Sequence, residues 1–155
     1  MKLILMRHTE AVWSFGLDDR ERPLSPTGTD DAHKLGRWLL HHGHSPSLAV
    51  VSDALRTQET YLALSLSSPT KTRAELYLAT PQVLLKEVHK SQTECLLVVA
   101  HNPGIAELAH DLAGHNLDES QFYEQPPGST LVGNYDLKTG QMKVIDFITP
   151  IKLKI

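Results

Sequence analysis

Short runs of consecutive apolar residues recur along this chain and alternate with segments of helical periodicity. The runs at 3–6, 48–51 and 96–100 are apolar at every position, as in strands buried on both faces of a parallel sheet. Two later strands are expected at 130–136 and 142–148, joined by a tight turn. This order predicts an α/β three-layer sandwich with a mostly parallel central sheet, helices on both faces and a C-terminal antiparallel hairpin.

Four helices are predicted between these strands. A capping residue followed by proline is typical of a helix start, and the chain has three such pairs: Ser25-Pro26, Thr80-Pro81 and Asn102-Pro103. The fourth helix is expected to be capped by Ser52-Asp53 and to carry an apolar side made of Leu55, Leu62 and Leu66. The polar stretch at 115–127 is expected to be a surface crossover, with a substrate-facing lid as the alternative.

Size and charge narrow the classes of partner. A chain of 155 residues with 41% hydrophobic residues suits one globular domain, residues 1–155. The formal net charge of −3 supplies no basic field to hold nucleic acid or an anionic membrane, so we expect neither partner. The first residues are too quickly charged for a signal peptide, no run is long enough to cross a bilayer, and the single cysteine, Cys95, excludes an internal disulfide. The expected location is the cytoplasm.

Positively charged and titratable side chains follow the buried strands. Arg7-His8 comes directly after the first run, Arg56 lies in the first turn after the second, and His101 follows the third. The carboxyl ends of parallel strands meet at one edge of a sheet, where helix N-termini add unpaired N–H groups. Arginine grips two oxygens of an anion with its planar fork. This edge is therefore predicted to bind a compact, multiply charged anion, and phosphate fits best.

Histidine adds a neutral nitrogen lone pair that arginine lacks. A neutral imidazole can attack phosphorus, hold the phosphoryl group and then pass it to water. Neighbouring arginines favour the neutral ring and neutralise charge in the transition state. His8 is thus the predicted nucleophile, with Arg7, Arg56 and His101 around it. The alternative, that an Arg-His pair only solvates a strand end, is disfavoured because four such groups follow three strands.

A metal site is the competing interpretation. The two histidines and the carboxylates Asp18 and Asp19 could ligate a divalent ion, but arginines at the same strand ends would repel it. We therefore predict neither a metal nor another cofactor. The His41-His42-Gly43-His44 cluster has a simpler explanation, because histidine at a helix C-terminus suits the last carbonyls and the helix dipole.

The motifs together resemble a known family. Leu5-Met6-Arg7-His8 is similar to the signature of the histidine phosphatase superfamily, which has a phosphoglycerate mutase-like fold. The segments at 19–28, 52–60, 76–79 and 98–104 resemble, in the same order, those of the short SixA-like phosphohistidine phosphatases. The resemblance implies hydrolysis through a covalent phosphohistidine on His8 and a substrate that bears phosphate, such as a phosphohistidine-containing protein of signal transduction.

The resemblance also extends the list of site residues. It places Arg22 in the phosphate pocket and makes Asp19 and Glu75 candidates for substrate binding. The general acid stays open among Asp18, Asp19 and Glu75, and a P–N bond would need a weaker acid because its leaving group is an imidazole. Two other functions remain: a small-molecule phosphomonoesterase using the same pocket, and a non-catalytic phosphate- or phosphopeptide-binding module.

Overall fold

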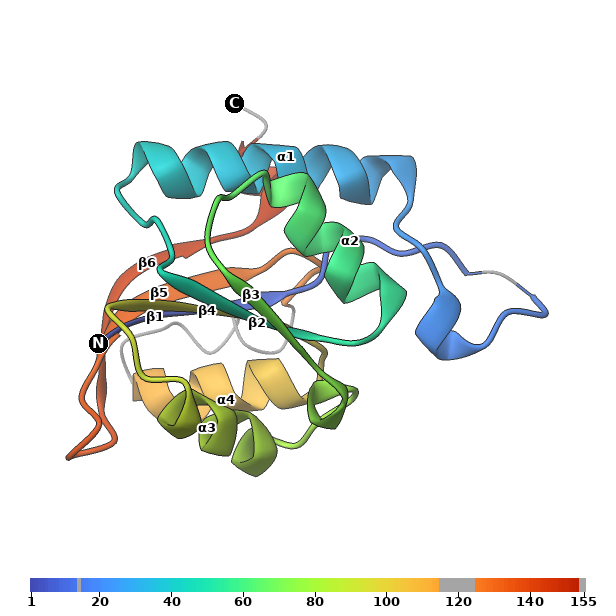
Figure 1. Cartoon of the computed structure of the whole chain (residues 1–155). Helices are drawn as coiled ribbons and strands as arrows, with labels where there is room; N and C mark the ends of the chain where they lie inside the picture. The colour runs from blue at the N-terminus through green and yellow to red at the C-terminus, as the bar shows by residue number, and fades with distance from the viewer. Residues whose placement is uncertain (14, 115–124, 154–155) are drawn as a thin grey trace.

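The strands form one mixed sheet, shown in Figure 1. The computed structural model describes residues 1–13, 15–114 and 125–153. Within them the sheet has six strands in the order β3-β2-β4-β1-β5-β6. The first four in this order run parallel, and β5 is antiparallel to both of its neighbours, which confirms the predicted sheet and C-terminal hairpin. The bounds are β1 (Lys2–Arg7), β2 (Leu48–Ser52), β3 (Thr70–Arg73), β4 (Cys95–Ala100), β5 (Thr130–Tyr135) and β6 (Met142–Ile148).

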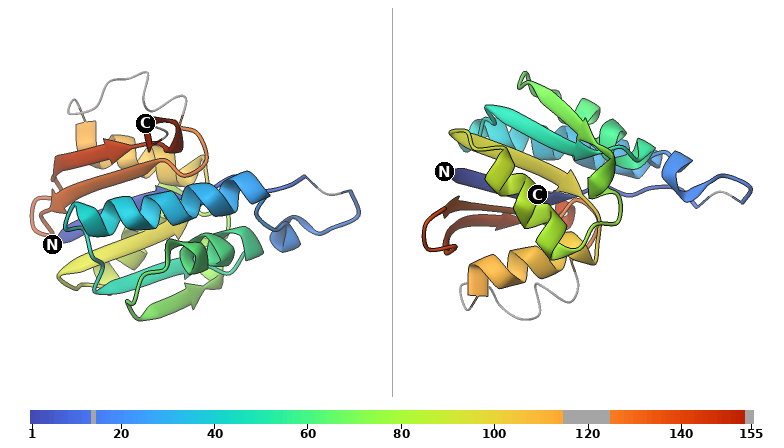
Figure 2. Two further views of the ribbon diagram at one scale, coloured as in Figure 1. Left: turned by 90° about the horizontal axis from the view of Figure 1, so that it is seen from above. Right: turned by 60° about the horizontal axis from the view of Figure 1, so that its bottom comes forward.

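Helices cover both faces of the sheet, as Figures 1 and 2 show. One face is covered by α1 (Pro26–His41) and α2 (Leu55–Leu64), and the other by α3 (Pro81–Lys90) and α4 (Gly104–Ala113). This arrangement confirms the three-layer sandwich. Three short 3-10 turns complete the described chain: η1 (Asp19–Glu21), η2 (Ala74–Leu76) and η4 (Pro150–Leu153). Most of the polar stretch predicted as a crossover, residues 115–124, lies outside the described residues.

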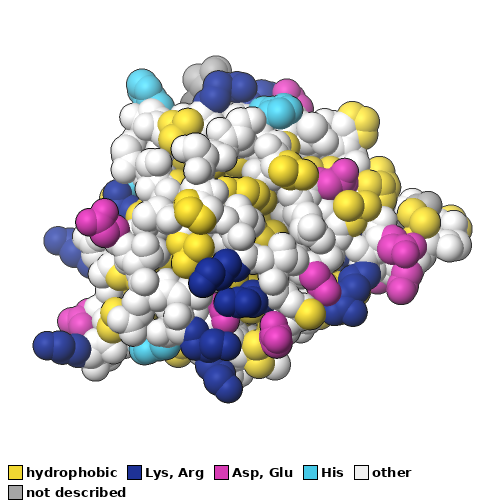
Figure 3. All heavy atoms as spheres, viewed as in Figure 1, with side chains coloured by type: hydrophobic (Ala, Val, Ile, Leu, Met, Phe, Trp, Pro, Cys, Tyr) yellow, Lys and Arg dark blue, Asp and Glu magenta, His cyan; other side chains and the backbone are white. Residues whose placement is uncertain are grey.

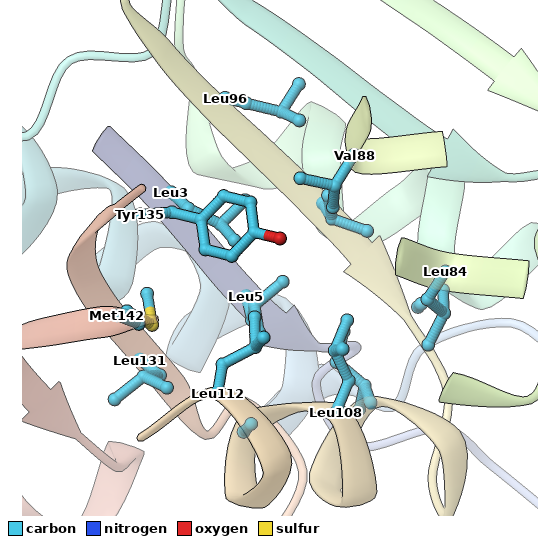
Figure 4. Close-up of a cluster of buried hydrophobic side chains, with 14 of the residues drawn as sticks. Leu3, Leu5, Leu84, Val88, Leu96, Leu108, Leu112, Leu131, Tyr135 and Met142 are labelled. Atoms are coloured by element: carbon cyan, nitrogen blue, oxygen red, sulfur yellow. The ribbon is translucent and has the colours of Figure 1, made fainter. Parts of the chain in front are cut away.

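The two cores share the central strands. In β1, Leu3 and Leu5 face the α3–α4 side, whereas Ile4 and Met6 face the α1–α2 side. Figure 4 shows the first of these cores, in which Leu108 of α4 lies near β1. Because helices cover both faces, apolar side chains are needed at consecutive positions rather than alternate ones. This is the physical origin of the uninterrupted apolar runs in the sequence.

Two of the predicted helix starts have the expected caps. The Ser25 hydroxyl accepts a hydrogen bond from the Gly28 amide at 3.0 Å, and the Thr80 hydroxyl accepts one from the Val83 amide at 3.3 Å. At the end of α1, His42 is the capping residue, as the histidine cluster suggested. His44 lies beyond the helix and is buried, with its Nε2 2.7 Å from Oδ2 of Asp146 in β6.

Four details of the prediction were wrong. Helix α2 is preceded by Ala54 with no side-chain cap, and Leu62 is 73% exposed. The buried side of α2 is partly polar because it carries Arg56 and other residues that build the pocket described below. Helix α4 starts after Pro103 without a side-chain cap bond. The prediction also lacked β3, an edge strand whose exposed, polar residues show no apolar run.

Within the described residues, no helix combines the length and the apolar character needed to span a membrane.

A close approach of backbones joins α1 to α2. A Cβ added at Gly36 would lie 1.9 Å from the carbonyl oxygen of Leu64, so only glycine allows this contact. We expect Gly36→Ala to lower the free energy of unfolding by about 2 kcal/mol, because overpacking against rigid backbone outweighs the better helix propensity of alanine. Urea denaturation measures the change. Arg37→Ala, on the exposed side of α1, is the control, and equal stability of the two variants would contradict the expectation.

Candidate active site

The pairing of β1 with β4 places two histidines side by side. Arg7 lies opposite Ala100 in the parallel register, and the His8 amide donates to the Ala100 carbonyl at 3.1 Å. The rings of His8 and His101, one residue beyond each strand, then have centroids 5.4 Å apart. The chain leaves β1 through α1 on one face of the sheet and leaves β4 through α4 on the other, and ligands bind at such topological switch points.

A cavity of about 360 Å³ opens at this edge. It brings together the predicted residues Arg7, His8, Arg22, Arg56 and His101, together with Asp19. The remaining lining residues come from the segment after β1, from the turn after η2 and from the loops around 102 and 127: Glu10, Ala11, Trp13, Leu78, Asn102 and Pro127. Charged groups from four separate parts of the chain therefore meet in one pocket.

The orientation of His8 is set by the backbone. Its Nδ1 lies 2.7 Å from the carbonyl oxygen of the next residue, Thr9. A carbonyl oxygen only accepts, so Nδ1 carries the hydrogen and the neutral ring has its lone pair on Nε2. Thr9 is itself held from α2, because its amide donates to the Thr60 hydroxyl at 3.1 Å. The ring is thus prepared as a nucleophile at a defined atom.

Burial keeps both histidines neutral. The pKa of His8 is lowered to about 4, chiefly by burial and further by the charges of Arg7, Arg56 and Arg22, while the hydrogen bond to Thr9 acts in the opposite direction. The pKa of His101 is lowered to about 3, again chiefly by burial and then by the charge on His8. At neutral pH the lone pair on His8 is therefore available without loss of a proton.

Buried nitrogens without hydrogen-bond partners gather around this cavity. Among the described residues they include Nε of Arg7, Nε of Arg56 and Nδ1 of His101. Arg7 is held by a bond of 2.7 Å from Nη1 to the Gln125 carbonyl, and Arg56 is only 3% exposed. Leaving a buried donor unpaired is costly, so such a group requires a partner that the described residues do not supply. An anion with several oxygens would meet this requirement.

Asp19 holds two of the arginines. Its carboxylate accepts from Nη1 of Arg22 and from Nη2 of Arg56, each at 3.0 Å, and its carbonyl accepts from Nη1 of Arg56 at 2.6 Å. The Tyr77 hydroxyl also donates to this carboxylate. These bonds, the one from Tyr77 foremost, hold the pKa of Asp19 far below its usual range. An ionised Asp19 has no proton to donate, which argues against it as the general acid.

His101 is positioned by neighbours on two sides. Its Nε2 lies 2.8 Å from the Ser52 hydroxyl at the end of β2. The Tyr77 ring meets the His101 ring edge-on, with centroids 5.5 Å apart. With Nε2 engaged in this way, Nδ1 is the nitrogen without a protein partner among the described residues.

Two predicted carboxylates lie outside the pocket. Glu75 is exposed in η2 and does not line the cavity, and Asp18 is exposed before η1. Glu75 also does not pair with Arg73, whose Nε instead binds Oε1 of Glu87 at 2.8 Å. The short turn after β3 directs Tyr77 and Leu78, rather than Glu75, toward the site. Across the described parts of the chain, no three His, Cys, Asp or Glu side chains cluster as metal ligands.

Several pocket residues were not predicted. Glu10, Trp13 and Leu78 line the cavity, and Ser52 and Tyr77 contact its charged groups. Ser52 and Tyr77 lie inside segments that the sequence did single out, so the position after β2 and the block at 76–79 carried a usable signal. Glu10 and Trp13 follow His8 without any pattern, and only the path of the chain reveals them.

Comparisons with known proteins agree with this geometry. The family model of the histidine phosphatase superfamily (branch 1) matches residues 3–77. An uncharacterised protein of Mycobacterium tuberculosis strain H37Rv is 31% identical over 110 residues, which are 70% of each chain. A structure from Nakamurella multipartita, described as a candidate phosphohistidine phosphatase SixA, is 28% identical with a TM-score of 0.76, and the match covers 97% of this chain and 96% of that one. The protein histidine phosphatase SixA complexed with tungstate shares the fold, with 23% identity, a TM-score of 0.80 and coverage of 99% and 100%.

The titration of His8 tests the geometry directly. In pH-dependent NMR of the imidazole nitrogens, we expect His8 to stay neutral and protonated on Nδ1 until the pH approaches about 4. The unfolded chain takes up this proton near the ordinary value of 6.5, so the free energy of unfolding should fall as the pH drops from 6.5 toward 4. His8→Asn identifies the signal by its loss. A His8 midpoint near 6.5 would contradict the buried, neutral ring.

Proposed function

This chain belongs to the histidine phosphatase superfamily, and on that basis we propose that it is a phosphohistidine phosphatase. Its substrate would be a protein carrying phosphorylated histidine, such as a signalling protein. The coarser conclusion, a phosphatase, is supported by the family and by the SixA-like neighbours. One observation carries the proposal: a neutral histidine with its lone pair on Nε2 stands in a pocket of buried, unpartnered nitrogens.

The first step transfers the phosphoryl group to the enzyme. Nε2 of His8 attacks phosphorus, a new N–P bond forms, and the bond to the leaving group breaks. The leaving imidazole takes up a proton from solvent. Arg7, Arg56 and His101 offer their free nitrogens to the phosphoryl oxygens, where charge spreads in the transition state.

The second step returns the enzyme to its starting state. Water attacks the phosphorus on His8, the N–P bond breaks, and inorganic phosphate leaves with both protons of that water. Nε2 then regains its lone pair, while Nδ1 keeps its hydrogen through the bond to Thr9. The backbone contact thus holds the same tautomer in both steps, so no proton has to move around the ring.

The carboxylates of the pocket favour a P–N substrate. Asp19 is ionised, and Glu75 lies outside the cavity. Imidazole needs less help from an acid than an alkoxide does, so phosphohistidine suits a pocket without an evident proton donor. Among the described residues, Glu10 supports a small-molecule phosphomonoesterase instead, because this acidic residue lines the cavity, although its Oε1 accepts from the Ser25 hydroxyl at 2.9 Å. Sugar phosphates and phosphoglycerate, assayed beside a phosphohistidine protein, separate the two functions.

Removal of the nucleophile is the first test of function. We expect His8→Ala to lower turnover of a phosphorylated histidine-containing transfer protein by on the order of 10³-fold or more. Labelled phosphate should appear on the wild-type protein in an acid-labile, base-stable bond, and the variant should not be labelled. His41→Ala, at the exposed end of α1, removes a histidine far from the pocket and should retain full activity. Full activity of His8→Ala would exclude His8 as the nucleophile.

Asp19 offers a second test, which separates positioning from acid catalysis. We expect Asp19→Asn to lower kcat/KM at least about tenfold, because Arg22 and Arg56 lose their shared partner. An acid must be protonated to act, so a true general acid would produce a fall in rate at alkaline pH that its removal abolishes. Because Asp19 is ionised, we expect the variant and the wild type to have pH–rate profiles of the same shape at alkaline pH.

The neighbouring exposed residue provides the control for this test. Asp18→Asn changes the same charge outside the cavity and should leave kcat/KM for the small substrate p-nitrophenyl phosphate unchanged. A fall in rate at alkaline pH that is present in the wild type and in Asp18→Asn but absent in Asp19→Asn would identify Asp19 as the general acid.

A further inference from the structure

An arm extends from the body of the molecule next to the pocket, at the right in Figures 1 and 2. The outgoing and returning segments of the arm are paired near its base, where Ala11 and Leu24 form an isolated antiparallel bridge and the Val12 amide donates to the Pro23 carbonyl at 3.0 Å. This arm is the segment between Ala11 and Leu24. The phosphate chemistry described above uses its residues Asp19 and Arg22, but it gives no role to the residues that follow Val12 and precede Asp19.

Three large apolar side chains of the arm are exposed. Trp13 is 83% exposed, Phe15 is fully exposed and Leu17 is 44% exposed. We call these three residues the arm patch. Figure 3 shows hydrophobic atoms on the arm, at the right-hand side of the view. Large apolar side chains that are exposed close together on a surface often mark an interaction site.

One residue of the arm patch, Trp13, reaches the pocket. Trp13 lines the cavity, and Cζ of Arg22 lies 3.8 Å from the centroid of the Trp13 ring. The same guanidinium binds Asp19, which holds Arg56. A surface seated on the arm patch would therefore lie over the mouth of the pocket.

The base of the arm is fixed to the site. Nε of Arg20 binds Oδ1 of Asp53 at 3.0 Å, and its Cζ lies 4.2 Å from the centroid of the Tyr77 ring. Asp19 adds the bonds to Arg56 and Tyr77 described above. A platform that is held in place before binding loses less entropy when a partner arrives.

We propose that the arm patch is a docking surface for the protein that carries the phosphorylated side chain. This inference rests on the proposed phosphatase function and adds where the substrate's protein surface is held. The partner surface would be apolar next to the phosphorylated residue. Asp18 and Glu21 are exposed in the same arm and would belong to the polar rim of such an interface.

Two other occupants fit the arm patch less well. A small phosphate ester that fills the cavity would not reach Phe15 or Leu17, because neither residue lines it. A permanent partner, such as a second copy of this chain, would cover Trp13 and with it the entrance to the pocket. A substrate protein uses both surfaces at once and leaves after the reaction.

Phe15→Ala tests the proposal, because Phe15 belongs to the arm patch but not to the cavity. Two substrates are compared: a phosphorylated histidine-containing transfer protein and p-nitrophenyl phosphate. We expect kcat/KM for the phosphoprotein to fall about tenfold, mainly through KM, because truncated aromatic anchors account for much of the energy of an interface. Hydrolysis of p-nitrophenyl phosphate should be unchanged. Leu62→Ala removes a similarly exposed side chain from α2 and should alter neither rate.

The other outcomes would overturn the docking proposal. If Phe15→Ala hydrolysed both substrates at the same rates as the wild type, the arm patch would not contact the phosphoprotein. An equal loss on both would show that Phe15 acts on the pocket. Wild-type protein that is dimeric in light scattering, with a monomeric Phe15→Ala variant, would assign the arm patch to a second copy.

A second readout separates this proposal from the proposed function. Binding of the same phosphoprotein to His8→Ala, and to His8→Ala combined with Phe15→Ala, does not depend on turnover. Roughly tenfold weaker binding by the double variant supports docking even where the wild type is inactive, and equal binding rejects it. Inactivity of the wild type on both substrates would reject the phosphatase function alone.

Discussion

The parallel pairing of β1 with β4 is the constraint on which the site depends. It sets Arg7 opposite Ala100, so that the next residues, His8 and His101, leave the sheet as neighbours. A shift of β1 by one residue in this register would turn its side chains to the opposite faces, and the two hydrophobic cores that hold those side chains resist such a shift. The packing energy of the sandwich therefore also maintains the spacing of the two rings.

The pocket balances burial against charge. Burial makes the histidines neutral, but it also makes it costly to bring Arg7 and Arg56 together without an anion. Asp19 relieves part of this repulsion from one side while leaving inner nitrogens unoccupied. A pocket without Asp19 would hold more positive charge, yet Arg22 and Arg56 would lose the carboxylate that holds their planar guanidinium groups in place. Asp19 therefore contributes the fixed arrangement of the hydrogen-bond donors rather than a change in total charge.

Sequence reasoning recovered the fold well because its signals are local. The buried strands are apolar at every position, and Ser25 and Thr80 cap their helices through their own side chains. It also found the charged residues that follow strands, since topology alone brings those together. It misplaced Glu75 and did not find Trp13, because their positions depend on the course of a turn and of an arm that no periodic pattern describes. Leu62 misled for a different reason: the buried side of α2 serves the pocket and is partly polar.

The contact between His8 and the Thr9 carbonyl has a consequence for how the chain tolerates mutation. A backbone acceptor cannot be deleted by a change of side chain, so substitutions at position 9 alter packing against Thr60 but leave the hydrogen-bond acceptor of His8 in place. His101 has no such protection, because the Ser52 hydroxyl that it meets can be lost in a single substitution. Over evolutionary time the tautomer of His8 is therefore inherited with the fold, whereas the orientation of His101 must be maintained by selection on another residue.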